Sequence, residues 1–382
     1  MLYELGTGGW REARRGSGFL MVGPLRLIVD HGVSAAEGLA LDEALVRRCE
    51  ENGNTTLRLY TYSDHAVLVG RYQRVEAEID LDEVTIRHLD INRRPTGGGT
   101  IVMGSGQLGI ALVFKEENPS TPRQVLESFG GVLATTLGHL GIQASLAGKN
   151  DLEVTGRKVA GLGIFRTPRG GTLCHASVLG SLDTQVMTAV LRTPAVKAES
   201  KLQAELAQRT VTLSELLNRS VFGSDLIEEF SLALPPAMGV TGVSRERPDD
   251  YELAIASDLL AHKYSQSSWI FSRDGVTPAE HLVTFRTTLG TVQLVLRIAG
   301  AAVRDASVTG DFIDSDCRLS ALPKALRWQP LSSVHLADVV SEVLGDLVDR
   351  RALGEAFAVS WIGGDAMPFR IGSCYLPEGG VK

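Results

Sequence analysis

Apolar residues recur along this chain with the two periods that distinguish helices from strands. Residues 35–50 and 124–140 carry apolar side chains at helical spacing, so each segment predicts an amphipathic helix. Gly141 follows the second segment at the usual place of a helix C-terminal cap. Further helices are predicted over residues 182–191, 197–208, 211–217, 224–233, 251–264 and 334–347.

Short apolar runs bounded by turn residues predict strands between these helices. The runs cover residues 25–29, 57–62, 66–70, 101–102, 108–114 and 151–154, and another begins at Lys158. Alternating segments at 290–298 and 301–309 add strands near the C-terminus. Strands and helices mixed in this way predict an α/β (α+β) fold, in which helices flank a mixed sheet.

The apolar pattern is interrupted at Ser272–Pro278, where polar residues, a glycine and a proline follow one another. Such a segment is typical of a boundary between domains. We therefore expect a large catalytic domain over residues 1–274 and a smaller α+β accessory domain over 275–382. The length of 382 residues and the hydrophobic content of 44% are sufficient for two cores.

Charge and cysteine usage narrow the class of partner. A net charge of −7 without a basic block argues against a nucleic-acid partner, since phosphate binding depends on clustered Lys and Arg. The partner is then a small molecule or a protein. Four widely separated cysteines favour a reduced, cytoplasmic setting, and no apolar run reaches the ~18 residues of a membrane span.

A glycine-rich segment carries the first candidate chemistry. Its three glycines can adopt positive φ and let a ligand approach the backbone, so their amides could surround phosphate or carboxylate oxygens. The paired arginines before them would supply positive charge to the same oxygens. An ordinary glycine turn is the alternative explanation. The segment is Arg93-Arg94-Pro95-Thr96-Gly97-Gly98-Gly99-Thr100.

A second motif follows about fifty residues later. Lys158 enters a predicted strand directly after the turn Thr155-Gly156, so its side chain can be aimed rigidly into a pocket. From local sequence alone, Lys158 could equally be a surface lysine, and Asn150-Asp151 could cap a turn. The motif comprises Lys149-Asn150-Asp151 and Gly156-Arg157-Lys158-Val159-Ala160-Gly161.

Together these motifs resemble the superfamily of lipoate-protein ligases, biotinyl ligases and octanoyltransferases. The lipoate ligase branch carries Arg-Arg-x-x-Gly-Gly-Gly, Asn-Asp and Gly-Arg-Lys-x-x-Gly in this order. Three further segments match its first helix, its Gly-Arg-x-Gln strand end and its His-Gly-Thr-Leu-Leu segment: Leu39–Ala44, Val69–Gln73 and Cys174–Leu179, with His175 in the last. Val308–Phe312 is similar to a Gly-Asp-Phe-Phe turn in the accessory domain of complete lipoate ligases.

The resemblance implies an ATP-dependent enzyme that activates lipoate or octanoate as an acyl adenylate. The acyl group would then pass to a lysine of a lipoyl domain. Acceptors would be the glycine-cleavage H protein or the acyltransferase subunits of 2-oxoacid dehydrogenases. Lys158 would be catalytic, because its ammonium could stabilise charge on both the acyl carbonyl and the α-phosphate. Asp151 would hold Mg²⁺, which prefers a few oxygen ligands plus phosphates. The expected binding residues are Arg71, Arg93, Arg94, Gly97, Gly98, Gly99, Asn150, Asp151, Gly161 and His175.

The chain departs from the family motif after the glycines. Met103 stands where the family has a His, and Gly104–Gln107 replaces Asp-x-Gly-Asn. Met103 could line a channel for a fatty or dithiolane chain. This change leaves the acyl specificity open.

Two alternatives to the ligase remain. The first is octanoyl transfer from acyl carrier protein, or from another lipoyl protein, through a cysteine thiolate. Residues 146–149 hold no cysteine, and Cys174 is more typical of an inert buried thiol. The second alternative is a non-catalytic protein that binds an acyl adenylate or a lipoyl domain.

Overall fold

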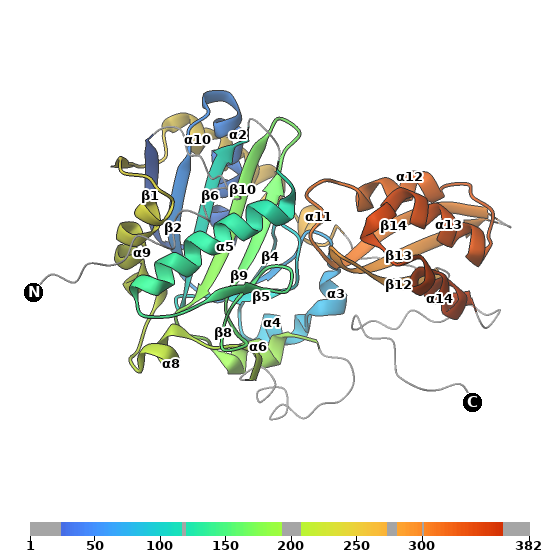
Figure 1. Cartoon of the computed structure of the whole chain (residues 1–382), viewed down its shortest axis with the longest axis horizontal. Coiled ribbons are helices and arrows are strands. Elements are labelled where there is room, and N and C mark those ends of the chain that lie inside the picture. Colours follow the sequence, from blue (N-terminus) through green and yellow to red (C-terminus); the bar gives the residue numbers. More distant parts are fainter. Residues whose placement is uncertain (1–23, 117–119, 193–207, 273–280, 300–301, 362–382) are drawn as a thin grey trace, which may run out of the picture.

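The computed structural model describes residues 24–361 except 117–119, 193–207, 273–280 and 300–301. An eight-stranded mixed sheet forms the centre of its larger part (Figure 1). The strand order is β11-β1-β2-β6-β10-β9-β8-β7. The strands are β1 Leu25–Val33, β2 Thr56–Tyr62, β6 Gln107–Lys115, β7 Ser145–Ala147, β8 Asp151–Val154, β9 Arg157–Arg166, β10 Gly171–Leu179 and β11 Val243–Arg245.

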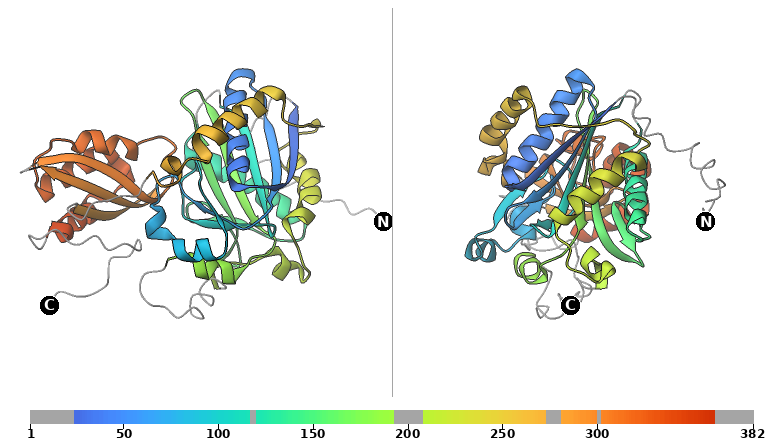
Figure 2. Two further views of the ribbon diagram at one scale, coloured as in Figure 1. Left: turned by 180° about the vertical axis from the view of Figure 1, so that it is seen from behind. Right: turned by 90° about the vertical axis from the view of Figure 1, so that its left-hand side faces the viewer.

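Helices cover both faces of this sheet (Figure 2). Helices α5 and α9 lie on one face, and α2 and α10 lie on the other. A π-helical turn, Leu260–Tyr264, continues α10. The helices of this part are α2 Ala35–Asn52, α3 Val75–Glu78, α4 Leu81–Ile86, α5 Pro122–His139, α6 Thr184–Val190, α8 Leu213–Leu217, α9 Gly223–Ala237, α10 Asp250–Leu259 and α11 Ser267–Ile270.

The alternation of side chains along β2 explains why both faces need a helical layer. Leu57 and Leu59 pack into the core under α5 and α9. Tyr60 and Tyr62 point to the opposite face and pack against α2. Since successive strand residues face opposite sides, a strand that is buried throughout must lie between two layers.

A small second sheet holds the glycine-rich segment. Its order is β4-β3-β5, with β3 Ala66–Val69, β4 Asp90–Arg93 and β5 Ile101–Met103. Strand β3 pairs in parallel with β4 and antiparallel with β5. Residues 94–100 therefore form the loop that crosses from one side of β3 to the other.

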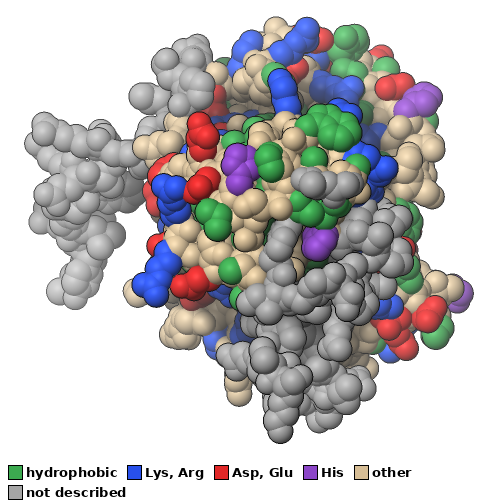
Figure 3. All heavy atoms as spheres, turned by 90° about the vertical axis from the view of Figure 1, so that its right-hand side faces the viewer, with side chains coloured by type: hydrophobic (Ala, Val, Ile, Leu, Met, Phe, Trp, Pro, Cys, Tyr) green, Lys and Arg blue, Asp and Glu red, His purple; other side chains and the backbone are tan. Residues whose placement is uncertain are grey.

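The C-terminal part has a separate apolar core around a three-stranded antiparallel sheet. Positive and negative side chains are interspersed on its outward face (Figure 3). Its elements are β12 His281–Thr287, β13 Gly290–Ala299, β14 Ala302–Phe312, α12 Leu322–Leu326, α13 Ser333–Leu344, α14 Arg350–Trp361 and the 3₁₀ turns Leu319–Ala321 and Gly345–Leu347.

The end of β14 joins the two parts. Phe312 stacks on Tyr72 with ring centroids 4.4 Å apart, and its carbonyl accepts a hydrogen bond from the Gly98 amide at 3.0 Å. Ile313 packs into the core of the larger part. The segment expected to form a turn, Val308–Phe312, is thus the end of a strand that reaches the glycine loop.

The predicted fold class is confirmed: a mixed sheet with flanking helices precedes a smaller α+β part. The helix predicted at 197–208 falls largely on residues 193–207, outside the described residues. The boundary after residue 274 also lies outside them, so the division into 1–274 and 275–382 stays a prediction. Among the helices of the described residues, none combines the length and the apolar character that a bilayer crossing requires.

Candidate functional site

A pocket of about 280 Å³ lies where the glycine loop, the β8–β9 hairpin, β10 and the end of β14 meet. Eight of the predicted site residues line it: Arg94, Gly97, Gly99, Asn150, Asp151, Lys158, Gly161 and His175. The two motifs, separated by about fifty residues in the sequence, thus line one cavity. We refer to its charged lining residues, with the glycine loop, as the charged end and to its apolar lining residues as the apolar end.

Arg94 is the most enclosed cation of the charged end. Its side chain reaches back over the glycine loop and donates to the carbonyl of Gly99 at 2.7 Å. The buried Nε atom has no hydrogen-bond partner. Burial lowers the pKa of Arg94 to about 10, although Tyr62 and Asp311 partly oppose this shift. An enclosed guanidinium with an unused donor is suited to an anionic ligand.

Lys158 and Asp151 face each other across the β8–β9 hairpin. Their turn residues Thr155 and Gly156 have φ values of 51° and 79°, as a tight two-residue hairpin turn requires. The Lys158 ammonium lies 2.7 Å from the Asp151 carboxylate, and both side chains are about one-third exposed. Because the pair is accessible to water, a ligand could exchange for either partner at modest cost.

Asn150 is fixed by the strand beside it. Its Nδ2 group donates to the Leu162 carbonyl at 2.7 Å, and the Leu162 amide donates back to the Asn150 carbonyl. This pair of bonds holds the start of β8 against β9. Asn150 therefore positions the Asp151 and Lys158 wall in addition to lining the pocket.

Side chains from four elements form the apolar end of the pocket. Met103 is 3% exposed and lies among them, as expected for a channel that takes an apolar chain. Tyr60 and Tyr62 present their rings to the same space. The apolar lining residues are Leu39 from α2, Tyr60 and Tyr62 from β2, Leu68 from β3, and Ile101 and Met103 from β5.

His175 lies on β10 and is bound to a buried carboxylate. Its Nε2 is 2.8 Å from Oδ2 of Asp42, a residue of α2 that is wholly enclosed. Arg58 donates to the other carboxylate oxygen at 2.7 Å, and the Tyr60 hydroxyl donates to Oδ2 at 3.2 Å. Burial alone would raise the pKa of Asp42, but the Arg58 charge and the His175 hydrogen bond bring it below the usual value.

Three predicted binding residues do not line the pocket. The Arg93 guanidinium is buried and donates to the carbonyls of Gly70, Arg71, Gln73, Trp269 and Ile270. These bonds tie the end of β4 to α11, so Arg93 supports the fold rather than lining the pocket.

Arg71 and Gly98 are also outside the lining. The Arg71 guanidinium lies near the rings of Tyr72 and Phe165, at 5.7 and 5.9 Å from their centroids. Gly98 has φ +96°, and a Cβ built there would lie 3.8 Å from both Arg94 Nη2 and Asn150 Nδ2. Gly98 thus borders the pocket through the space that its missing side chain leaves.

Among the charged lining residues, Lys149, Asp311 and Arg209 were not predicted as site residues, and neither was Asp42 behind His175. Lys149 and Asp311 form an ion pair at 3.4 Å across the two parts of the chain, and the exposed Arg209 lies at the rim. The sequence could have indicated three of them by their positions inside the matched motifs: Lys149, Asp311 and Asp42. Arg209 follows a segment without any such signal.

The thiols of the described residues lie away from this pocket. Cys49 and Cys174 are enclosed, and burial raises the pKa of both, that of Cys49 to about 11. Cys317 is exposed on the C-terminal part. Cys374 lies outside the described residues. Within the described part of the chain, no cysteine lines the cavity beside Lys158.

The carboxylates of the pocket bear on the predicted Mg²⁺ site. In the described residues no cluster of three or more His, Cys, Asp or Glu is arranged to hold an ion. Asp151 and Asp311 both line the charged end, however, and Mg²⁺ that arrives with phosphates needs only one or two carboxylates. Asp151 therefore remains the predicted Mg²⁺ ligand.

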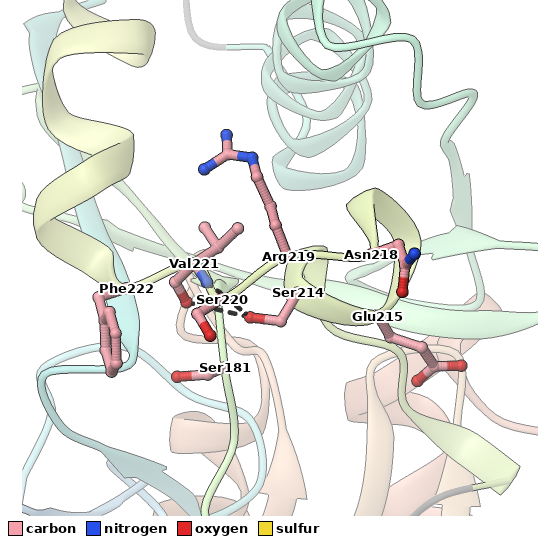
Figure 4. A pocket seen from close by; sticks show the side chains of 8 residues that line it. All are labelled: Ser181, Ser214, Glu215, Asn218, Arg219, Ser220, Val221 and Phe222. Carbon is pink, nitrogen blue, oxygen red and sulfur yellow. Dashed lines mark hydrogen bonds between the residues drawn. The ribbon is translucent and has the colours of Figure 1, made fainter.

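A second hollow lies between Ser181 and the loop that joins α8 to α9 (Figure 4). The Ser214 hydroxyl donates to the Gly180 carbonyl and accepts from the Val221 amide. The charged residues at its rim already have partners, because Glu215 pairs with Arg157 and Arg219 with Glu229. None of the predicted site residues lies there.

Comparison with known proteins agrees with this placement. The family model of the lipoyl protein ligase A/B catalytic domain matches residues 34–234, which include both motifs and His175. Octanoyltransferase LipM of Brevibacillus brevis is 28% identical over 276 residues, covering 65% of this chain and 99% of that protein. Lipoate-protein ligase LplJ of Bacillus subtilis is 22% identical, covering 72% of this chain and 81% of that protein.

Solved structures share the fold. A P. falciparum LipL1 structure in complex with lipoate superposes with a TM-score of 0.66 at 18% identity, covering 88% of this chain and 99% of its own. The bipartite lipoate protein ligase of Thermoplasma acidophilum gives a TM-score of 0.61 at 22% identity, covering 66% of this chain and 98% of its own. The family model matches more than half of the 382 residues, so the chain belongs to the lipoyl protein ligase A/B catalytic domain family.

Proposed function

From this family membership we propose that the protein is an ATP-dependent lipoate-protein ligase. It activates lipoate, or a medium-chain analogue such as octanoate, to an acyl adenylate, and then acylates a lysine of a lipoyl domain. The acceptors we propose are the lipoyl domains of 2-oxoacid dehydrogenase acyltransferase subunits and the glycine-cleavage H protein.

One observation carries the choice of an adenylate over a thioester. Four cationic side chains line the pocket, whereas no thiol of the described residues does. An acyl adenylate needs these cations for its phosphate, whereas a covalent acyl-enzyme needs an accessible thiolate. The cations are Arg94, Lys149, Lys158 and Arg209.

The two-ended lining also suits the adenylate. An apolar chain can lie against Leu68, Ile101 and Met103, while the phosphate meets Arg94 and the glycine loop. The reacting carbonyl then falls between the ends, beside Lys158. Positioning the acid and the nucleotide in this way supplies much of the catalysis by orientation and charge stabilisation.

Octanoyl transfer is the second candidate, and the relatives favour it. Octanoyltransferase LipM proteins align with 61–65% of this chain at 26–29% identity. A transferase of this kind would take its octanoyl group from acyl carrier protein and hold it on a cysteine. That mechanism requires Cys174 to become accessible, or Cys374 to enter the pocket.

A cysteine-free variant separates the two functions. We expect Cys49, Cys174, Cys317 and Cys374, all replaced by Ala, to leave lipoate-dependent pyrophosphate release and lipoyl-domain acylation near the wild-type rates. Loss of acylation in a variant whose circular dichroism and melting remain near the wild type would favour transfer. Trapping an octanoyl thioester on the native protein, located by mass spectrometry, would overturn the ligase proposal without depending on that variant.

A further inference from the structure

We propose that His175 is the proton acceptor for attack by the acceptor lysine, and that Asp42 is its positioning residue. This inference rests on the proposed acyl transfer to a lysine amine. It adds an acid–base partner to the charge-stabilising role assigned to Lys158.

The buried carboxylate fixes which nitrogen of His175 carries the proton. Asp42 is a residue of α2 with no exposed side-chain surface, and its charge is neutralised by Arg58 at 2.7 Å. An ionised carboxylate can only accept hydrogen bonds, so Nε2 of His175 must be the donor at 2.8 Å. The neutral ring then carries a lone pair on Nδ1.

The side chain remains accessible from the pocket. His175 lines the cavity and keeps 12% of its side-chain surface exposed. No hydrogen bond to Nδ1 is found in the described part of the chain. A ring with one nitrogen held by a buried acid and the other free is arranged as a general base.

The position of His175 on β10 relates it to Lys158 through Ser177 and Gly161. Gly161 lies beside both the Lys158 ammonium and the Ser177 hydroxyl, at 3.0 and 3.6 Å from its constructed Cβ. His175 is two residues before Ser177 and points to the same face, about 7 Å along the strand. His175 therefore lines the same pocket as Ser177 and Lys158, and we place the acyl carbonyl between His175 and the Lys158 ammonium.

The free-base nitrogen of the acceptor lysine forms a bond to the acyl carbon while the carbonyl π electrons move onto its oxygen, and the new bond makes the N–H acidic. One proton passes from that nitrogen to Nδ1 of His175. The carbonyl re-forms as the C–O bond to the α-phosphate breaks, and AMP leaves with the electron pair of that bond. The imidazolium, stabilised by the Asp42 carboxylate, then releases its proton to solvent.

The test measures amide formation separately from activation. Single-turnover transfer to a lipoyl domain is followed from a supplied acyl donor, and lipoate-dependent pyrophosphate release reports adenylation. We expect His175→Ala to slow transfer by ~10²-fold or more at neutral pH while adenylation stays near the wild-type rate. Equal losses in both half-reactions, or an unchanged transfer rate, would overturn the proposal.

Asp42→Asn tests the positioning role without removing the imidazole. The amide can present its NH₂ to Nε2, which would leave the proton on Nδ1 and block proton acceptance. We expect a transfer defect close to that of His175→Ala. Because Asp42 pairs with Arg58 in the core, the melting temperature is measured too. If this variant unfolds, added imidazole should instead restore transfer by His175→Ala. Failure of imidazole to restore transfer would contradict the role of His175 as the base.

The pH profile distinguishes a base from a packing residue. A protonated imidazole accepts no proton, so the advantage of the wild type over His175→Ala should shrink at acid pH. Other titrating groups should cancel in this ratio of rates. These are Asp42 on α2, Arg58, Tyr60 and Tyr62 on β2, Arg94 in the loop, Asp151 on β8, Lys158 on β9 and Asp311 on β14. A ratio that does not change with pH would contradict the role.

The chain offers a matched control on its surface. His262 and Asp258 form a second His–Asp pair at 2.9 Å, with 78% and 65% exposure, on α10 and its continuation. His262→Ala should leave both half-reactions unchanged.

If wild-type protein rejects lipoyl-AMP but accepts octanoyl acyl carrier protein, the ligase function fails while the His175 test proceeds with that donor. A protein that accepts neither donor overturns both proposals.

Discussion

The two ends of the pocket are built from different kinds of structure. The apolar end consists of strand and helix residues that belong to the central core, such as Leu39, Tyr60 and Met103. The charged end combines the glycine loop, the strands of the β8–β9 hairpin, Arg209 and the end of β14, which belongs to the C-terminal part. Its cations Lys158 and Lys149 are paired with partly exposed carboxylates rather than enclosed.

This difference indicates how the work is divided. Under the proposed function, the packed end would recognise an acyl chain by shape alone, and truncations there would also loosen the core. The charged end would exchange its exposed ion pairs for ligand phosphates without disturbing the core. We therefore expect substitutions at the charged end to change rate and nucleotide affinity, and substitutions at the apolar end to change the use of the acid and the stability of the core.

Lys158→Ala should give the largest effect. Loss of one preorganised charge-stabilising group commonly costs ~10²–10³ in rate, and we expect this loss in adenylation and in transfer from lipoyl-AMP. The melting temperature should hardly change, since the only ion pair lost is half-open to water. Arg157→Ala is the control, because Arg157 pairs with the exposed Glu215. Turnover near the wild-type rate in the Lys158 variant would remove it from the mechanism.

The adjacent arginines should separate affinity from stability. Arg94→Gln is expected to weaken binding of a lipoyl-AMP analogue by roughly 10–100-fold, as for lost charged hydrogen bonds. Arg93→Gln should instead lower the free energy of unfolding by about 2–4 kcal/mol, because it leaves buried carbonyls unpaired. Calorimetric binding and thermal melts measure the two effects. Interchanged results would mean that the pocket is wrongly placed.

Gly98→Val should weaken binding of ATP and of the adenylate by about tenfold. Its φ of +96° strains a β-branched residue by ~1–3 kcal/mol, and the new side chain would enter the space between Arg94 and Asn150. Gly53→Val controls for strain alone, because Gly53 has φ +72° at a helix end remote from the pocket. If both variants bind nucleotide equally well, the glycine loop has no role in phosphate binding.

The sequence was sufficient for those parts of the site that lie within one motif. The turn before Lys158 and the glycines before β5 are local features, and their chemistry follows from residue type and spacing. Pattern reasoning also predicted β2, α2 and α5 close to their observed ends. Local periodicity is enough for elements whose burial is regular.

Long-range partners could not be read from the sequence. The residues around Arg93 and Arg94 do not show that the first contacts α11 whereas the second lines the pocket. These contacts depend on the direction that each side chain takes in the folded protein. Asp42 and His175 are 133 residues apart, and their pairing depends on how α2 packs across β10. The short strand β4 was missed because Asp90–Arg93 is polar.

Glu78, the last residue of α3, should make the stability of the protein depend on pH. Burial and the nearby charge of Asp311 raise its pKa to about 7. The folded state therefore holds a proton that the unfolded state releases above pH ~4.5, so stability falls as pH rises through this window. Between pH 5 and 8 we expect the unfolding free energy of wild type to fall about 1–2 kcal/mol more than that of Glu78→Gln. Glu83→Gln, on the surface, should show no such difference.

Met103→Ala should have the smallest effect on the reaction, and that effect should be limited to the acid, although the truncation also lowers stability because Met103 is part of the core. Met103 is enclosed at the apolar end, so truncation removes contacts with the acyl chain and leaves the phosphate contacts in place. We expect KM for lipoate to rise by up to about tenfold with kcat and the KM for ATP unchanged, the pattern of lost uniform binding. Met103→Leu, which conserves volume, should stay near the wild type. A matching rise in the KM for ATP would show that the two ends are not independent, and would contradict the division of work between them.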